Sequence, residues 1–267
     1  VSLEGHTVRG AGIDATLISV ASGAEVCEVV SLDGAGASVL ALTIDASTVA
    51  ENCPTGDASG IIVPNGTGDH MIQDVVVRGY VTPDAADSSA HGLVGINAIM
   101  AVDTIIRNVE VQDTSRDGIR ISGGQVTIDG AHIVNPAQFQ PEFGGIAVHT
   151  SAATGSAEVE LAGHISFSAP ESVGFVLSSA DDETITLHSS GLSAEVEDTW
   201  FALGAWRGIG PSSIGNLIAP LGITHIAAET GNPPANGFFV ATASGNPQDA
   251  VDLALHYRHA TDNIGPD

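Results

Sequence analysis

The sequence predicts an all-β fold, a single-stranded right-handed parallel β-helix (solenoid) in which short strands wind around an apolar core. Hydrophobic residues make up 43% of the 267 residues but aromatic residues only 4%, so Val, Ile, Leu and Ala must build that core. The 32 glycines suit tight corners between short strands. A glycine-containing motif also returns at near-regular intervals, which is typical of a repeat architecture.

The repeated motif is a glycine, an apolar residue, any residue and usually a second apolar residue. Copies occur at residues 60–63, 92–95, 118–121, 145–148 and 174–177. One unit cannot bury its own apolar side, but units stacked in register join those sides into one continuous core. A β-sandwich would also contain many short strands, but it does not explain why the glycine motif recurs.

Alternation along the motif predicts which side chains face the core, because successive residues of a strand point to opposite sides. If Ile119 and Ile121 face inward, Arg120 faces outward. The full set of predicted core residues is Ile61, Val63, Leu93, Ile119, Ile121, Ile146, Val148, Phe175 and Leu177.

The motif also predicts an outward stripe of mostly apolar side chains on either side of Arg120. Its members are Ile62, Val94, Ala147 and Val176. An exposed apolar strip is unusual on a monomer, and the polar loop at 81–90 would cover it poorly. We therefore expect a homo-oligomer with closed symmetry, such as a trimer.

The regular pattern covers residues 1–200, which we assign to the coils of the β-helix. Residues 201–267 are less regular and rich in proline, with turn-like Gly-Asn-Pro segments at 231–233 and 245–247. We interpret 201–267 as terminal coils and a C-terminal cap of the same domain. A cap would cover strand edges that are otherwise unpaired.

The charge balance excludes several partners. Seven basic residues, all Arg, stand against 32 Asp and Glu, for a formal net charge of −25. Such a surface repels phosphate backbones and anionic membranes, so neither nucleic acid nor membrane insertion is expected. The acidity fits adaptation to high salt, as in halophilic proteins, or a compositional bias of a GC-rich genome.

Two cysteines, Cys27 and Cys53, lie about one solenoid turn apart. They would therefore stack in neighbouring coils, either as a disulfide or as two buried thiols. The first residues already read as a strand and a corner. We expect the natural chain to begin earlier, with a signal and a cap, and the protein to be extracellular or on a cell or virion surface.

Two segments carry a family resemblance. Residues 5–18 contain Arg-Gly-Ala-Gly followed by Thr-Leu-Ile, and residues 115–124 contain Ser-Arg-Asp-Gly-Ile-Arg-Ile-Ser-Gly-Gly. Both resemble coils of the pectate-lyase-like superfamily of right-handed parallel β-helices, and the resemblance covers roughly residues 1–200. It implies architecture rather than a reaction, because lyases, hydrolases, epimerases, phage tailspikes and adhesins share such coils.

The candidate catalytic residues are Arg116, Asp117 and Arg120. A sugar-acid lyase needs a cation for the substrate carboxylate and a base for the adjacent proton. Related families use lysine as that base, so Arg or His would have to replace it here. A hydrolase needs paired carboxylates, and Asp113 and Asp117 have no matching acidic pair in the neighbouring coil. The alternative is a structural corner, with Asp117 capping the turn before Gly118.

No cofactor is expected, and the ten histidines do not form a metal site by their spacing. His256 and His259 could share a helical face, but two ligands are weak evidence. His132 and His164 fall in similar strand slots two units apart, as outward polar residues. The acidic corner at 181–183 could bind Ca²⁺ or be a solvated turn.

Two functions remain open at this level. The first is a structural or adhesive surface protein that contacts glycans, such as a fibre, spike or adhesin component. The alternative is a polysaccharide lyase or glycoside hydrolase that acts on an extracellular polysaccharide.

Overall fold

The computed structural model describes most of the first 197 residues and four short strands beyond them. The described ranges are 1–21, 23–49, 53, 57–80, 92–138, 144–168, 173–179, 185–197, 202–204, 217–218, 226–227 and 239–241. Within these ranges every assigned element is a strand, and all pairings between the strands are parallel. No described segment forms a helix long and apolar enough to cross a membrane.

The strands stack in three ladders, which we name the first, second and third faces. The first face contains β3 (Glu28–Ser31), β5 (Asp57–Val63), the starts of β7 (Gly92–Gln112) and β8 (Ile119–Val134), β9 (Gly144–Thr150), β11 (Val173–Ser179), β13 (Ala202–Gly204) and β16 (Phe239–Ala241). The second contains β1 (Thr7–Arg9), the first halves of β4 (Ser38–Asp45) and β6 (Met71–Arg78), the middles of β7 and β8, the first halves of β10 (Ala157–Ser168) and β12 (Ile185–Glu197), and β14 (Leu217–Ile218). The third contains β2 (Leu17–Ser19), the ends of β4, β6, β7, β8, β10 and β12, and β15 (Ile226–Ala227).

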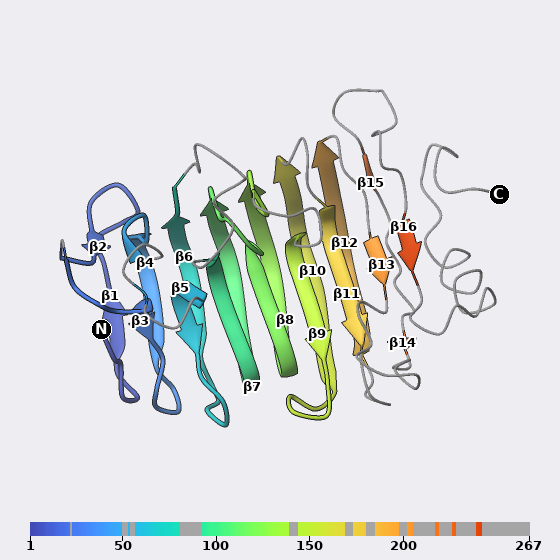
Figure 1. The fold of residues 1–267 in the computed structure, drawn as a ribbon, viewed down its shortest axis with the longest axis horizontal. Coiled ribbons are helices and arrows are strands. Elements are labelled where there is room, and N and C mark those ends of the chain that lie inside the picture. The colour runs from blue at the N-terminus through green and yellow to red at the C-terminus, as the bar shows by residue number, and fades with distance from the viewer. Residues whose placement is uncertain are drawn as a thin grey trace.

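Each turn of the chain passes once through each face and then pairs with the turn before it. Figure 1 shows the strands side by side along the long axis of the molecule, with the N-terminus at one end. The fold is therefore the predicted all-β, right-handed parallel β-helix.

The core consists of aliphatic columns that run along the solenoid. Ile61, Ile96, Ile119 and Ile146 are partners in successive strands of the first face, and all four are fully buried. The burial predictions for Ile61, Val63, Leu93, Ile119, Ile121, Ile146 and Val148 are confirmed. The side chains of Phe175 and Leu177 lie outside the described part of the structure.

The recurring glycine has a packing cause, and it corrects the predicted alignment of one coil. A Cβ on Gly95 would lie 2.3 Å from Val111 Cγ1, and a Cβ on Gly118 would lie 2.6 Å from Ile133 Cγ2. Side chains of the third face thus fill the space where the first face begins. In β7 the motif glycine is Gly95, whereas the sequence had suggested Gly92.

The predicted apolar stripe is wrong at Val94, whereas Ile62 and Ala147 do share the slot of Arg120. Ile62 is half-buried. The partner of Arg120 in β7 is Asn97, not Val94, because the alignment was one glycine early. Val94 and Ala147 are both fully buried. The side chain of Val176 lies outside the described residues, as does the loop at 81–90. The predicted self-association therefore loses the observation on which it rested.

Corners of the solenoid adopt left-handed backbone conformations at matching places. Between the second and third faces, φ is positive at Asp74, Asn108, Gly130 and Gly163. Asn108 Nδ2 donates a hydrogen bond to Asp74 Oδ1 at 2.6 Å, so polar side chains link neighbouring coils at this corner. Small residues and short polar residues are the types that tolerate this conformation.

Cys27 and Cys53 form a disulfide, with Cα atoms 4.6 Å apart and a sequence separation of 26 residues. The bond ties the start of the second coil to the start of the third. The acidic corner at 181–183, the pair His256 and His259, and almost all of 201–267 lie outside the described residues. Among the residues that are described, no group of three or more His, Cys, Asp and Glu side chains could hold a metal ion.

Candidate functional site

The candidate site lies where the chain enters β8 on the first face, and buried hydrogen bonds hold this corner in place. Thr114 and Ser115 are both fully buried. Ser115 Oγ accepts a hydrogen bond of 2.6 Å from the N–H of Leu93, and the N–H of Arg116 donates to the Leu93 carbonyl at 3.0 Å. Thr114 Oγ1 donates to the Arg116 carbonyl at 2.8 Å. The backbone around Arg116 is therefore fixed before any ligand binds.

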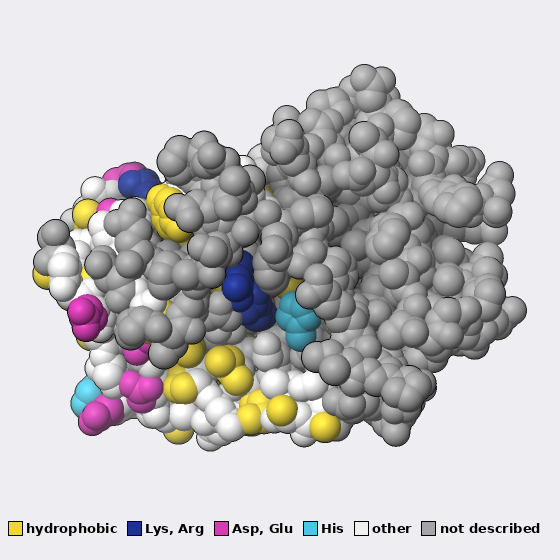
Figure 2. Space-filling model, in the orientation of Figure 1, with side chains coloured by type: hydrophobic (Ala, Val, Ile, Leu, Met, Phe, Trp, Pro, Cys, Tyr) yellow, Lys and Arg dark blue, Asp and Glu magenta, His cyan; other side chains and the backbone are white. Residues whose placement is uncertain are grey.

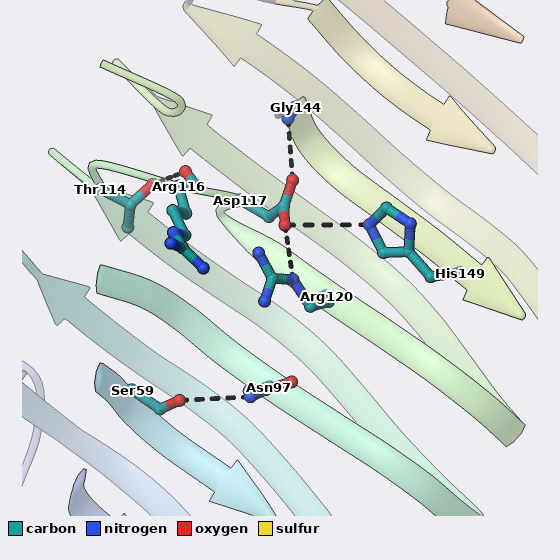
Figure 3. A network of polar contacts seen from close by, with 8 residues as sticks. All are labelled: Ser59, Asn97, Thr114, Arg116, Asp117, Arg120, Gly144 and His149. Carbon is teal, nitrogen blue, oxygen red and sulfur yellow. Dashed lines mark hydrogen bonds and ion pairs between the residues drawn. The ribbon is translucent and has the colours of Figure 1, made fainter. Parts of the chain in front are cut away.

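Asp117 is the centre of a polar network that reaches two strands, β8 and β9 (Figure 3). Its side chain is fully buried, and its Oδ2 accepts a hydrogen bond of 2.6 Å from Arg120 Nε. Its Oδ1 accepts a hydrogen bond of 2.9 Å from the N–H of Gly144, the first residue of β9. The Nε2 atom of His149 lies 4.0 Å from Oδ2. One hidden carboxylate thus positions groups from β8 and β9.

Arg116 lies across the start of β7, where a glycine makes room for it. A Cβ on Gly92 would lie 1.9 Å from Arg116 Nε, so a larger residue there would displace the guanidinium. Arg116 and Arg120 are two of the chain's seven basic residues, and both lie at this corner around the carboxylate of Asp117 (Figure 3). Figure 2 shows dark-blue and cyan side chains adjoining on the described surface.

His149 belongs to this group, although the sequence analysis did not select it. Its side chain is 31% exposed, compared with 13% for Arg120 and none for Asp117. Burial lowers the pKa of His149 below its ordinary value of 6.5; the charge of Asp117 opposes this effect and that of Arg120 adds to it. The neutral imidazole is thus the favoured form near neutral pH, and a neutral imidazole can accept a proton.

Two polar residues extend the group toward the N-terminal coils. Asn97 is the β7 partner of Arg120, and its Nδ2 lies 3.4 Å from Ser59 Oγ in β5. Asn97 Oδ1 is buried and has no hydrogen-bond partner among the described residues. The sequence missed Asn97 because the coil was aligned on Gly92.

The structure brings Arg116, Asp117 and Arg120 to one corner. Their exposure differs, so they cannot all reach a ligand. Asp117 is shielded from solvent and bonded through both oxygens, so it positions its neighbours rather than reaching a substrate. Arg120 and His149 retain exposed surface. Alternation along the strand could have selected His149, because it lies two residues after Ala147 and therefore points to the same side of the strand. Its partner in β8 is Ser122.

Comparison with known proteins assigns no family to the chain. No protein-family model matches the chain, and no curated protein matches it. Among solved structures, the chain is similar to the catalytic domain of a GH87 alpha-1,3-glucanase in complex with tetrasaccharides, at 13% identity and a TM-score of 0.41. The match covers 91% of this chain and 55% of that structure.

Proposed function

We propose that this β-helix binds an acidic extracellular polysaccharide on its first face and cleaves it by elimination. The observation that carries the proposal is the shared contact of Arg120 and His149 with the buried carboxylate of Asp117. The Asp117 carboxylate holds the permanent cation of Arg120 and the mainly neutral imidazole of His149 next to each other. In a chain with a net charge of −25, such a corner is a local attraction for a carboxylate.

Elimination requires two groups that this corner supplies. Arg116 and Arg120 would pair with the uronate carboxylate, which favours loss of the proton on the adjacent carbon. His149 would accept that proton. The C–H electrons then form a carbon–carbon double bond, the glycosidic C–O bond breaks, and the departing oxygen takes a proton from water. No lysine is required.

A glycoside hydrolase fits this corner less well. Hydrolysis uses two carboxyl groups, one on each side of the glycosidic bond. Within the described network of the first face, the carboxylate is that of Asp117, which is buried and bonded to Arg120 and Gly144.

A purely adhesive glycan contact would use the same surface without cleaving the polysaccharide, so it differs from the proposal only in the absence of a reaction. The Cys27–Cys53 disulfide supports an oxidising, extracellular location.

The test is a screen of the purified chain against uronic-acid and neutral polysaccharides, followed by the ultraviolet absorbance of the unsaturated product. We expect product from uronates alone and at least a 100-fold lower rate for His149→Gln or Arg120→Gln. Arg107→Gln is the matched control, because it removes an exposed Arg on the second face. Binding without product would favour the adhesive role. Product from neutral glycans, or unchanged rates in both variants, would overturn the proposal.

A further inference from the structure

A groove of about 510 Å³ lies along the corner between the second and third faces. The strands β4, β6, β7, β8 and β10 contribute to it, and all of the residues that line it are described. Val75, Val109 and Ala131 are almost fully buried and form an apolar floor. The groove therefore offers a concave surface with an apolar base, the usual form of a small-molecule site.

A serine and a histidine are hydrogen-bonded to each other in this groove. His132 Nδ1 lies 2.7 Å from Ser166 Oγ, and both side chains are half-buried. The two residues are partners in adjacent strands, β8 and β10. This separation is within the range over which a histidine removes the proton of an attacking serine.

A carboxylate continues the same row on the other side of the histidine. Glu110 in β7 is the partner of His132 in β8, so Glu110, His132 and Ser166 occupy one outward slot on three successive strands. Neighbouring strands are about 4.8 Å apart, so Glu110 occupies the slot next to His132 without an ion pair between the two side chains. Glu110 also accepts a hydrogen bond from Gln112 Nε2. The observed unit is therefore the Ser166–His132 pair, with the negative charge of Glu110 one strand away.

The backbone departs from regular pairing beside the serine. Ala162 pairs with Asp129, but the next pair is Ile165 with Ala131, so Gly163 and His164 together face a single residue. Such a bulge takes a residue out of the regular ladder, and bulges are enriched next to active sites. Gly163 has a φ of +68°, a conformation that favours glycine, and a Cβ there would lie 2.8 Å from Asp129 Oδ1.

We propose that Ser166 and His132, with Glu110 in the adjacent slot, form a second centre, which hydrolyses carboxylic esters. Ser166 Oγ bonds to the ester carbonyl carbon while its proton moves to His132. The ester C–O bond then breaks, and the alcohol leaves with that proton. Water hydrolyses the acyl-serine and restores both residues. Because Asp74, Glu110 and Asp129 line the groove, the substrate is a neutral or cationic ester.

The test uses p-nitrophenyl acetate turnover and labelling by a fluorophosphonate, with the labelled peptide located by mass spectrometry. Ser166→Ala should lower kcat/KM at least 100-fold and abolish labelling. Ser168→Ala is the matched control, since Ser168 occupies the next outward slot of the same strand, and it should stay within twofold. His132→Gln should lower kcat without abolishing the fold, as judged by circular dichroism.

Ester hydrolysis by the intact chain that Ser166→Ala leaves unchanged would overturn the assignment, and so would labelling at another residue. The outcome is independent of polysaccharide cleavage on the first face. Arg120→Gln should retain full ester hydrolysis, because Arg120 does not line the groove. Failure of one centre would thus leave the other untouched.

Discussion

Arg120 donates a hydrogen bond of 2.6 Å from Nε to Oδ2 of Asp117, whose carboxylate is completely shielded from solvent. The guanidinium is itself only 13% exposed, so the pair lies in a medium of low polarity. The other carboxylate oxygen accepts the N–H of Gly144. The geometry of the partly buried Arg120 therefore depends on a charge that no ligand can reach.

Removing that charge should cost stability. We predict that Asp117→Ala lowers the free energy of unfolding by about 3–5 kcal/mol, because it removes the buried carboxylate that bonds Arg120 Nε. Asp117→Asn should cost less, since its amide oxygen can still accept from Gly144. Urea denaturation measures both. Asp129→Ala, which breaks the exposed pair with Arg107, is the control and should cost at most about 1 kcal/mol. Equal losses for Asp117→Ala and Asp129→Ala would contradict the account.

The pH profile of cleavage should report the environment of His149. Burial lowers the pKa of this imidazole below 6.5, and a general base acts only when deprotonated. The acid limb of kcat/KM should therefore lie below pH 6.5, with the rate falling as the pH drops through that limb. An acid limb above pH 6.5, measured on a uronate substrate, would show that His149 is not the base.

His70 should make the fold sensitive to acid. It is 1% exposed, and its Nδ1 lies 3.2 Å from the Ala37 carbonyl, while its Nε2 has no partner among the described residues. Burial lowers its pKa, and the contact with Ala37 and the charge of Asp69 only partly oppose this effect. The unfolded state then binds the proton more readily.

Because the unfolded state binds this proton more readily, acid should destabilise the fold. Stability should be constant above about pH 6.5 and fall as the pH drops toward the lowered pKa, by about 1.4 kcal/mol for each unit of depression. Urea denaturation at several pH values measures it. In His70→Asn, whose amide can still donate to Ala37, this part of the pH dependence should vanish. A slope that is identical in the variant would exclude His70 as its source.

Reduction of the disulfide should weaken the N-terminal coils. Cys27 and Cys53 close a loop of 26 residues, and the chain-entropy argument gives about 3 kcal/mol for a loop of this size. The double variant Cys27→Ala/Cys53→Ala should lose a similar amount in thermal or urea denaturation. Reductant should destabilise the wild type and leave the double variant unchanged.

The sequence predicted the fold because the glycine motif reports packing that every coil repeats. Ile119, Ile121 and Ile146 were placed correctly by alternation alone. The alignment failed in β7 because Gly92 and Gly95 both precede an apolar residue, and only the contact with Val111 shows that Gly95 is the repeating glycine.

The sites were harder to predict because they depend on register between coils. Asp117 was selected together with both arginines, but its burial depends on β9, which lies 27 residues further along the chain. His132 was matched with a slot two units away, whereas its partner is Ser166 on the adjacent strand. The bulge at Gly163 shifts that register by one residue, and no pattern in the sequence shows a bulge of this kind.

The central claim is that the Arg116 and Arg120 corner recognises a carboxylate. The most direct measurement is the binding affinity of the chain, by calorimetry at low salt, for one uronic-acid oligosaccharide and for the same oligosaccharide with its carboxyl groups reduced to alcohols. We predict that reduction weakens binding at least tenfold, or about 1.4 kcal/mol, and that Arg120→Gln removes most of this difference. Equal affinity of the wild type for the two oligosaccharides would contradict the claim.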